Sequence, residues 1–372
     1  MPVNNVGVRV YPRLHGDSFN CSGLHRVGFT VVAVATMIAG GILFAALGKN
    51  PFEAIRLIFW DPLFSEQFAS YSRPQLLVKA GPLILIAVGL SIGFRAGIWN
   101  IGAEGQFTMG ALCGGAVALA FYDVQGYWLL PLMCLAGVAG GMAWAAVPAF
   151  LKTRFQTNEI LTSLMLTYVA ILLLSVLVHG PLKDPEGLNF PESRLFHDSA
   201  ILPLLFDETR VHIGFLIALV VVVVTHIVLW RHIFGYQIKV QGEADRVARF
   251  AGFVQNRIVW RCLLISGGLA GLAGVFEAAG PVGQLVPALP TGYGFTAIIV
   301  AFLGRLHPVG ILFGGFVMAL TYIGGETAQM EMQMPKAVTS VFQGLLLFFL
   351  LGIDFLVRYR VVLTTRRRSA EG

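Results

Sequence analysis

The chain of 372 residues is 56% hydrophobic and only 12% charged, about half the charged share of an average soluble domain. Its mean hydropathy of +0.75 excludes an ordinary soluble enzyme and predicts a protein embedded in a lipid bilayer. The net charge of +6 does not indicate a nucleic-acid partner. The basic residues gather in short segments between apolar runs, as they do at the cytoplasmic ends of membrane helices.

The first apolar run is predicted to be a retained membrane span. Val27 to Gly48 is 22 residues long and holds no Asp, Glu, Lys or Arg, and about 20 apolar residues cross a bilayer. Arg9, Arg13 and Arg26 precede it, as in a signal peptide. The apolar run is too long for a signal peptide, however, and no convincing cleavage site follows it. Residues 1–26 are therefore predicted to be a cytoplasmic segment.

The remaining apolar runs predict a polytopic, all-α membrane protein. Backbone polar groups in lipid must be satisfied within their own segment, so each run should be a helix. About ten transmembrane helices are expected, with broken or short helices near 95–106 and 293–310. The predicted spans are 27–48, 76–94, 100–121, 127–151, 158–179, 210–230, 258–280, 293–304, 307–325 and 336–357.

Charge predicts the orientation of these spans. Residues 231–257 hold five bases against two acids, and residues 358–372 hold five arginines against one acid, whereas residues 180–210 hold three bases against six acids. An excess of Lys and Arg marks the cytoplasmic side. We therefore expect one transmembrane domain over 27–357, with a periplasmic loop at 180–210, a cytoplasmic loop at 231–257 and a basic cytoplasmic tail at 358–372. Both termini are then cytoplasmic.

Polar residues interrupt the apolar pattern between Arg95 and Gln106. Asn100, Glu104 and Gln106 lie there together with three glycines, and irregular backbone at membrane depth is tolerated only beside protein or a wet cavity. One interpretation is a broken helix that lines a translocation path through Asn100, Glu104 and Gln106. The other is a cytoplasmic turn with Arg95 extended to the surface. The residue types alone favour neither.

Several other polar residues have a structural alternative. Glu277 either lines the path or is an interfacial acid near the outer surface, and Glu326 is expected at the outer face. Asn158 and Glu159 open a span, where capping explains them. His212 and His226 are 14 residues apart, too far for a shared metal site. The four cysteines form no CxxC pair and resemble small buried hydrophobes.

The loop at 231–257 contains a second pattern, a short amphipathic helix. Acids (Glu243 and Asp245) come first and Gly252 comes last, which suits a helix dipole and a C-terminal cap. Val247 and Phe250, with the neighbouring Ala251, form one apolar face. This face should lie either on a cytoplasmic partner or on the membrane surface.

Four motifs resemble permease subunits of bacterial ABC importers, in the branch for simple sugars and nucleosides and, more distantly, branched-chain amino acids. The motifs are GLSIGFRAGIWNIGAEGQFTMGA (89–111), TNEILTSLMLTYVA (157–170), GPLKDPEGLNFPES (180–193) and GEADRVARFAG (242–252). The middle two point to the nucleoside type rather than the ribose type. Thr167 departs from the family, in which an Asn often stands at that position.

The resemblance implies a set of partners in the bacterial inner membrane. Two permease subunits, identical or homologous, would form the path, two cytoplasmic ATPases would drive it, and an extracytoplasmic binding protein would deliver the solute. The 242–252 segment would be the helix that docks on the ATPase. Its docking residues would be Gly242, Glu243, Val247, Ala248, Phe250, Ala251 and Gly252.

The chain itself is expected to bind no cofactor and no metal and to be a transport subunit rather than an enzyme. A P-loop requires Gly-Lys followed by Ser or Thr, but Gly48-Lys49 is followed by Asn50. ATP would therefore be used by the partner ATPase. An alternative is a stand-alone secondary transporter with Glu104 and Glu277 as proton-coupling groups. An intramembrane enzyme has no catalytic constellation in its favour.

Overall fold

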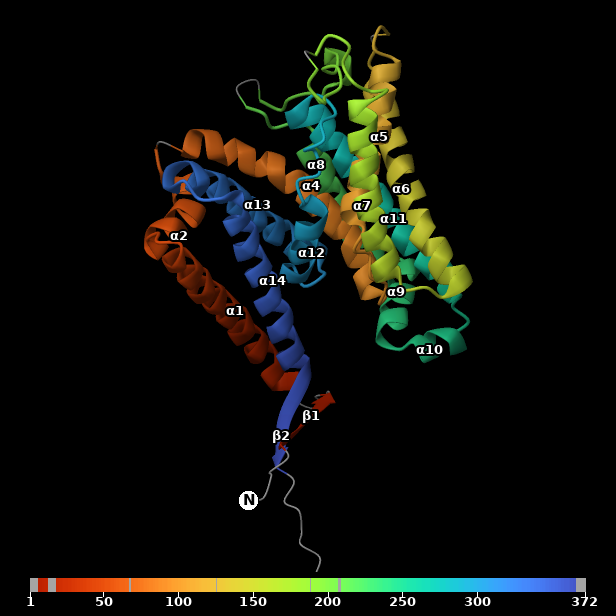
Figure 1. The fold of residues 1–372 in the computed structure, drawn as a ribbon. Helices are drawn as coiled ribbons and strands as arrows, with labels where there is room; N and C mark the ends of the chain where they lie inside the picture. The colour runs from red at the N-terminus through yellow and green to blue at the C-terminus, as the bar shows by residue number, and fades with distance from the viewer. Residues whose placement is uncertain are drawn as a thin grey trace, which may run out of the picture. The chain divides into compact units, whose positions relative to one another are not determined.

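The fold comes from a computed structural model, which describes residues 6–12, 18–66, 68–124, 126–187, 189–206 and 209–365. Helices dominate this part of the chain (Figure 1). The elements are β1 (Val6–Pro12), α1 (Ser18–Ala46), α2 (Pro51–Phe59), α3 (Asp61–Phe64), α4 (Ala69–Arg95), α5 (Ala103–Ala120), α6 (Leu129–Phe155), α7 (Glu159–His179), the 3₁₀ turn η2 (Asp198–Ala200), α8 (Gly214–Arg231), α9 (Ile233–Glu243), α10 (Asp245–Phe250), α11 (Gln255–Glu277), the π-helical turn η3 (Ala278–Val282), α12 (Tyr293–Leu303), α13 (Pro308–Met332), α14 (Lys336–Arg358) and β2 (Tyr359–Thr365).

The predicted polytopic α-helical membrane fold is confirmed. Among the described residues, six helices are long and apolar enough to cross a membrane, namely α4, α6, α7, α8, α11 with its π-helical turn, and α13. Shorter apolar helices cover Val34–Ala46, Tyr293–Leu303 and Ala337–Gly352. The breaks lie where they were expected, between α4 and α5 and around the short α12. The total of ten crossings stays a prediction.

The chain divides into two compact units, residues 1–57 with 325–372, and residues 58–324. In the first unit, α1 packs on α14, where the rings of Phe44 and Phe342 stack at 6.1 Å. Strands β1 and β2 pair antiparallel, from Val6 opposite Thr365 to Pro12 opposite Tyr359. This pairing brings the two ends of the described chain together. The prediction of one permease domain over 27–357 stays a prediction.

Glycines set the packing of α5, α6 and α11 in the second unit. A Cβ on Gly110 of α5 would lie 2.2 Å from the Cα of Gly271 in α11, and a Cβ on Gly271 would lie 2.2 Å from the carbonyl oxygen of Gly137 in α6. No side chain fits at these distances, so the three backbones are in direct contact. Small residues allow this close approach between membrane helices. The arrangement gives the second unit a rigid centre.

Burial separates the central helix of this unit from the peripheral ones. The most apolar window of α4 is 83% buried, whereas that of α7 is only 22% buried. The central position of α4 explains why Ala80 to Phe94 is apolar at almost every position. Helix α7 instead exposes a stripe at helical spacing, as expected of a surface that faces lipid. The stripe consists of Leu161, Met165, Tyr168, Leu172 and Val176.

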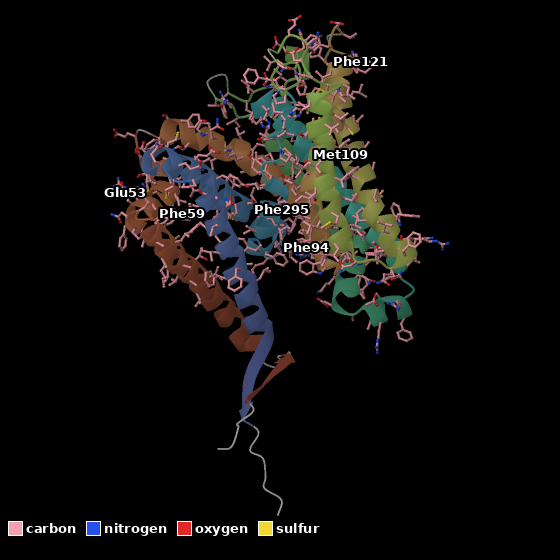
Figure 2. The ribbon with its side chains drawn as sticks, viewed as in Figure 1. Glu53, Phe59, Phe94, Met109, Phe121 and Phe295 are labelled. Atoms are coloured by element: carbon pink, nitrogen blue, oxygen red, sulfur yellow. The ribbon has the colours of Figure 1, made fainter. Side chains whose placement is uncertain are left out.

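The second unit has two distinct ends. The described residues of segment 181–213 cover one end, where the backbone N–H of Phe196 donates to the Gly283 oxygen at 2.8 Å and that of Leu202 to the Ala279 oxygen at 2.9 Å. Helices α9 and α10 lie at the opposite end (Figure 1). Figure 2 labels Phe94, at the end of α4, and Phe121, after α5, at these opposite ends of the bundle. The segments predicted to be periplasmic and cytoplasmic are therefore separated by the length of the helices.

Candidate coupling surface and interior polar network

The loop at 231–257 forms two short helices rather than one. Gly242 and Glu243 end α9, and Ala244, with a non-helical backbone (φ −153°, ψ 83°), separates them from α10. Gly252 follows α10 with a φ of 79°, the left-handed conformation that glycine adopts most readily. The N–H of Phe253 donates to the Ala248 oxygen at 3.0 Å, which completes the predicted glycine C-cap. The start of the predicted helix thus belongs to α9.

Helix α10 presents an exposed apolar surface. Phe250 is 93% exposed and Val247 56% exposed, and Ala251 is exposed beside them. Ala248 is fully buried and attaches the helix to the rest of the protein. Burying an exposed phenylalanine is worth roughly 1.5–3 kcal/mol, so this arrangement is unfavourable for a surface in contact with water alone. We call Val247, Phe250 and Ala251 the α10 surface.

Ionic and polar contacts hold α10 in shape. Arg249 donates to Asp245 one turn earlier at 2.5 Å, and Gln241 of α9 donates to the other oxygen of Asp245 at 2.6 Å. Pairs at this spacing add a few tenths of a kcal/mol to a helix. Asp245 and Arg249 therefore order the helix and leave its apolar residues free for a partner.

Helix α9 is packed closely against α4 and α8. A Cβ on Gly242 would lie 1.9 Å from the carbonyl oxygen of Arg95, and one on Gly235 would lie 2.2 Å from that of Leu229. Phe234 and Ile238 are buried in a cluster with apolar residues of α4, α6, α8 and α11. The loop that carries α10 is therefore anchored rigidly to the spanning helices.

The polar residues between α4 and α5 form a closed network. The Asn100 amide donates to the Gln106 oxygen at 2.8 Å and to the Ser266 hydroxyl of α11 at 3.0 Å. The Asn100 oxygen accepts from the Gln106 amide and from the Gly102 N–H, both at 3.1 Å. Asn100 and Gln106 are each 1% exposed. We call these residues the amide network; their role in a solute path stays a prediction.

Glu104 holds the start of another helix. Its two carboxylate oxygens accept from the N–H of Gly292 at 2.7 Å and of Gly294 at 2.5 Å. Gly292 is the N-cap of α12 and has no side chain to cap it, so Glu104, which is 1% exposed, supplies the acceptors that a capping residue normally provides. The carboxylate also interacts favourably with the positive end of the helix dipole. Glu104 thus joins α5 to α12.

Glu277 lies at the end of α11 and is 7% exposed. It accepts from the hydroxyl of Tyr293, the first residue of α12, at 3.4 Å. The Tyr293 ring contacts the rings of Phe107 and Tyr322 edge-on, at 6.0 and 5.5 Å. A position in the solute path stays a prediction for Glu277, as it does for Glu104.

The Arg95 side chain, which one interpretation of the sequence extends to the membrane surface, contacts other parts of the protein. Its Nε donates to the carbonyl oxygen of Leu306 at 2.9 Å, and its guanidinium lies over the Trp230 ring at 4.6 Å. The His226 ring stacks on Trp230 at 4.7 Å, and the His307 ring packs on it at a tilt of 59°, also at 4.7 Å. Sequence reasoning missed this cluster because its members come from α4, α8 and the turn before α13.

Other predicted residues have structural roles. The Asn158 side chain accepts from the Ile160 N–H at 2.9 Å, which confirms the predicted cap, and Glu159 pairs with Lys152 of α6. The Thr167 hydroxyl donates to the Ser163 oxygen at 3.2 Å. Glu326 is exposed in α13, and its proximity to a binding protein stays a prediction. Within the described ranges, no three His, Cys, Asp or Glu residues cluster as a metal site would require.

Comparison with known proteins identifies the family. Residues 73–351 match the model of the branched-chain amino acid transport system / permease component family. A glucose ABC transporter permease protein of Haloferax volcanii is 36% identical over 91% of this chain and 90% of its own length. A guanosine ABC transporter permease protein of Bacillus subtilis is 27% identical over 86% of this chain and 91% of its own.

A nucleoside ABC transporter permease protein of Lactococcus lactis is 25% identical over 88% of this chain and 90% of its own length. Among solved structures, PsaBC of Streptococcus pneumoniae in complex with a Fab aligns with a TM-score of 0.41 at 14% identity, over 80% of this chain and 94% of that one. The relatives are named as ABC transporter permeases, which favours a transport subunit over an enzyme and over a stand-alone secondary transporter. The chain belongs to the branched-chain amino acid transport system / permease component family, as a multi-pass permease subunit of an ABC transporter.

Proposed function

We propose that this permease carries a nucleoside or a simple sugar through the inner membrane, inward, at the expense of ATP hydrolysed by a separate ATPase subunit. In this proposal the α10 surface docks on the ATPase. A second permease subunit completes the path, and an extracytoplasmic binding protein delivers the solute at the end covered by residues 181–213. The chain itself binds no cofactor in this scheme.

The observation that carries the proposal is the α10 surface. Phe250 is 93% exposed on a short helix at one end of the bundle, and its loop is anchored through Gly242 and Phe234 to the spanning helices. Exposed apolar residues on an ordered scaffold are typical of a docking site. A helix that is rigidly attached to the spans can pass a movement of the ATPase to them, because packed elements shift as bodies.

The solute class is supported by the relatives and by the interior chemistry. The named relatives transport glucose, guanosine or nucleosides. The amide network consists of neutral amides and one hydroxyl, groups that both donate and accept hydrogen bonds. Such groups match the hydroxyls of an uncharged sugar or nucleoside better than the charged ends of an amino acid.

The pairing of β1 with β2 supports an even number of crossings. The two strands join the ends of the described chain, with Val6 opposite Thr365, and both ends are rich in arginine. Because an excess of Arg and Lys is retained in the cytoplasm, we place both termini there.

The docking of α10 is tested with Phe250→Asp, which puts a charge at the centre of the α10 surface. We expect the ATPase subunit to copurify at no more than about a tenth of the wild-type level, since a buried interface residue of this size contributes roughly 2 kcal/mol or more. Phe52→Asp is the matched control, because Phe52 is 84% exposed but lies in α2, far from α10 in sequence. Full copurification with Phe250→Asp would refute the docking assignment.

The solute is tested in vesicles that contain this chain, its ATPase, its partner permease and its binding protein. Labelled guanosine, ribose, glucose and leucine are offered in turn, with and without ATP. We expect saturable, ATP-dependent uptake of a nucleoside or a sugar and none of leucine. Uptake of leucine alone, or uptake that proceeds without the ATPase subunit, would overturn the proposal.

A further inference from the structure

We propose that Arg95 is a positioning residue of the transport cycle, which links the loop carrying α10 to the turn between α12 and α13. The inference rests on the proposed docking of the ATPase at α10 and adds a defined route from that loop into the spanning helices. Arg95 is the last residue of α4, the most buried of the spanning helices.

The first half of the route is the contact between α9 and the end of α4. Gly242, at the end of α9, lies so close to the Arg95 carbonyl that a Cβ would be 1.9 Å from the oxygen. Gln241, beside it, donates to Asp245 of α10 at 2.6 Å. A displacement of α10 must therefore move α9, and α9 cannot approach α4 without displacing the Arg95 backbone.

The second half is the contact of the Arg95 side chain with the α12–α13 turn. Arg95 Nε donates to the Leu306 oxygen at 2.9 Å. Arg305 and Leu306 both adopt left-handed backbone, with φ of 54° and 56°, a conformation that side chains other than Gly and Asn rarely adopt. The Arg95 bond therefore supports a turn whose backbone conformation is uncommon for these residues.

Trp230 fixes the direction in which the Arg95 side chain extends. The guanidinium lies over the Trp230 ring at 4.6 Å, and His307, in the same turn as Leu306, packs on that ring at 4.7 Å. The ring belongs to α8, which leads directly into α9. The planar guanidinium can stack on a ring and donate sideways at the same time, which an ammonium group cannot do.

The route reaches the interior because α12 is fixed at its other end. Glu104 binds the N–H groups of Gly292 and Gly294 at the start of α12, and Arg95 holds the turn at its end. A shift of the turn therefore acts on α5, two residues before the Gln106 of the amide network. By this path a movement of α10 changes the surroundings of the polar break.

The test measures solute taken up per ATP hydrolysed by the assembled complex in vesicles. Arg95→Gln removes both the positive charge and the planar guanidinium group. Arg95→Lys keeps the charge but not the planar group. Arg73→Gln is the matched control, because Arg73 lies at the other end of α4 and also donates to a backbone carbonyl, that of Leu63 at 3.0 and 2.7 Å.

We expect Arg95→Gln to bind the ATPase normally and to lower the uptake per ATP about tenfold, within the 5–150-fold range typical of coupling between sites. Arg95→Lys should recover part of the loss and Arg73→Gln should show none. If Arg95 acts only in folding, Arg95→Gln lowers the yield of assembled complex, but the uptake per ATP of the complex that does assemble stays at the wild-type value. That result would overturn the proposal.

If the Arg95→Gln complex does not assemble, Trp230→Leu is the alternative variant for the same measurement. It removes the ring beneath the guanidinium and must lower the same ratio; an unchanged ratio overturns the proposal. If the docking assignment is wrong, the ATPase will still copurify with the Phe250→Asp variant, whatever the uptake per ATP of the Arg95 variants. The two proposals can therefore fail separately.

Discussion

Replacing Glu104 with Gln tests whether this carboxylate is a structural clamp. Gln keeps the size of the side chain but presents one oxygen and one NH₂ group to the N–H groups of Gly292 and Gly294, which now bond two oxygens at 2.7 and 2.5 Å. One charge-assisted bond is lost and one buried N–H faces another donor. Hydrogen bonds to charged groups contribute about 1.5–3 kcal/mol and an unsatisfied buried donor costs about 1–3 kcal/mol, so we expect a loss of roughly 3–5 kcal/mol.

The loss is measured as the apparent melting midpoint of the purified subunit in detergent, beside its uptake activity in vesicles. Because one kcal/mol shifts the midpoint of a domain of 150–250 residues by about 2–4 °C, a fall of roughly 6–20 °C is expected. Glu53→Gln is the control, since Glu53 is exposed on α2 (Figure 2) and should change stability by no more than about 0.5 kcal/mol. An unchanged midpoint with abolished uptake would refute the clamp and support a direct role of Glu104 in the solute path.

Three further predictions follow from packing, hydrogen bonding and charge. Gly271→Leu should abolish a monodisperse elution profile, because its Cβ would lie 2.2 Å from the Gly137 oxygen, whereas Gly344→Ala, which meets no described atom within 4 Å, should stabilise by about 0.5–1 kcal/mol. Asn100→Ala should lower stability by about 1–3 kcal/mol by leaving buried polar groups unpaired; an unchanged midpoint would contradict the amide network. Burial, with His226 and Arg95 adding to it, lowers the pKa of His307 below 6.5, so its contribution to stability is complete above about pH 6.5 and is lost as the pH falls from there towards the folded-state pKa. His307→Asn should flatten the stability profile below about pH 6.5, and an unaltered slope would show that His307 is not the titrating group.

The spans, the breaks and the cap of α10 were predictable because local signals specify them. A run of apolar residues needs no knowledge of its neighbours to predict a membrane helix. Gly252 specifies the end of α10 through its own backbone freedom, at a φ of 79°. The exposure of Phe250 followed from helical spacing and from the charges around it. Each of these features depends on residues within a few positions of one another.

The partners of the polar residues were not predictable, because they lie far apart in sequence. Glu104 bonds residues 188 and 190 positions later, and Arg95 bonds one 211 positions later. The sequence shows that such groups must be satisfied in lipid but not which distant groups satisfy them. Gly292 does give a local indication in the sequence, because a glycine at the start of α12 has no side chain with which to cap the helix. Its φ of 91° is a conformation that glycine adopts readily.

The bonding of these groups separates their possible roles in a solute path. Asn100 and Gln106 bond each other through neutral amides. Such a bond can be exchanged for one to a solute hydroxyl at little net cost, since a neutral hydrogen bond contributes only about 1 kcal/mol. The two bonds to the Glu104 carboxylate cannot be exchanged in this way, because opening them exposes two N–H groups and a charge at once. We therefore expect solute to compete for Asn100 and Gln106 and to leave Glu104 in place. The path predicted from the sequence would then consist of two exchangeable amides beside a fixed carboxylate, and only the amides would contact the solute.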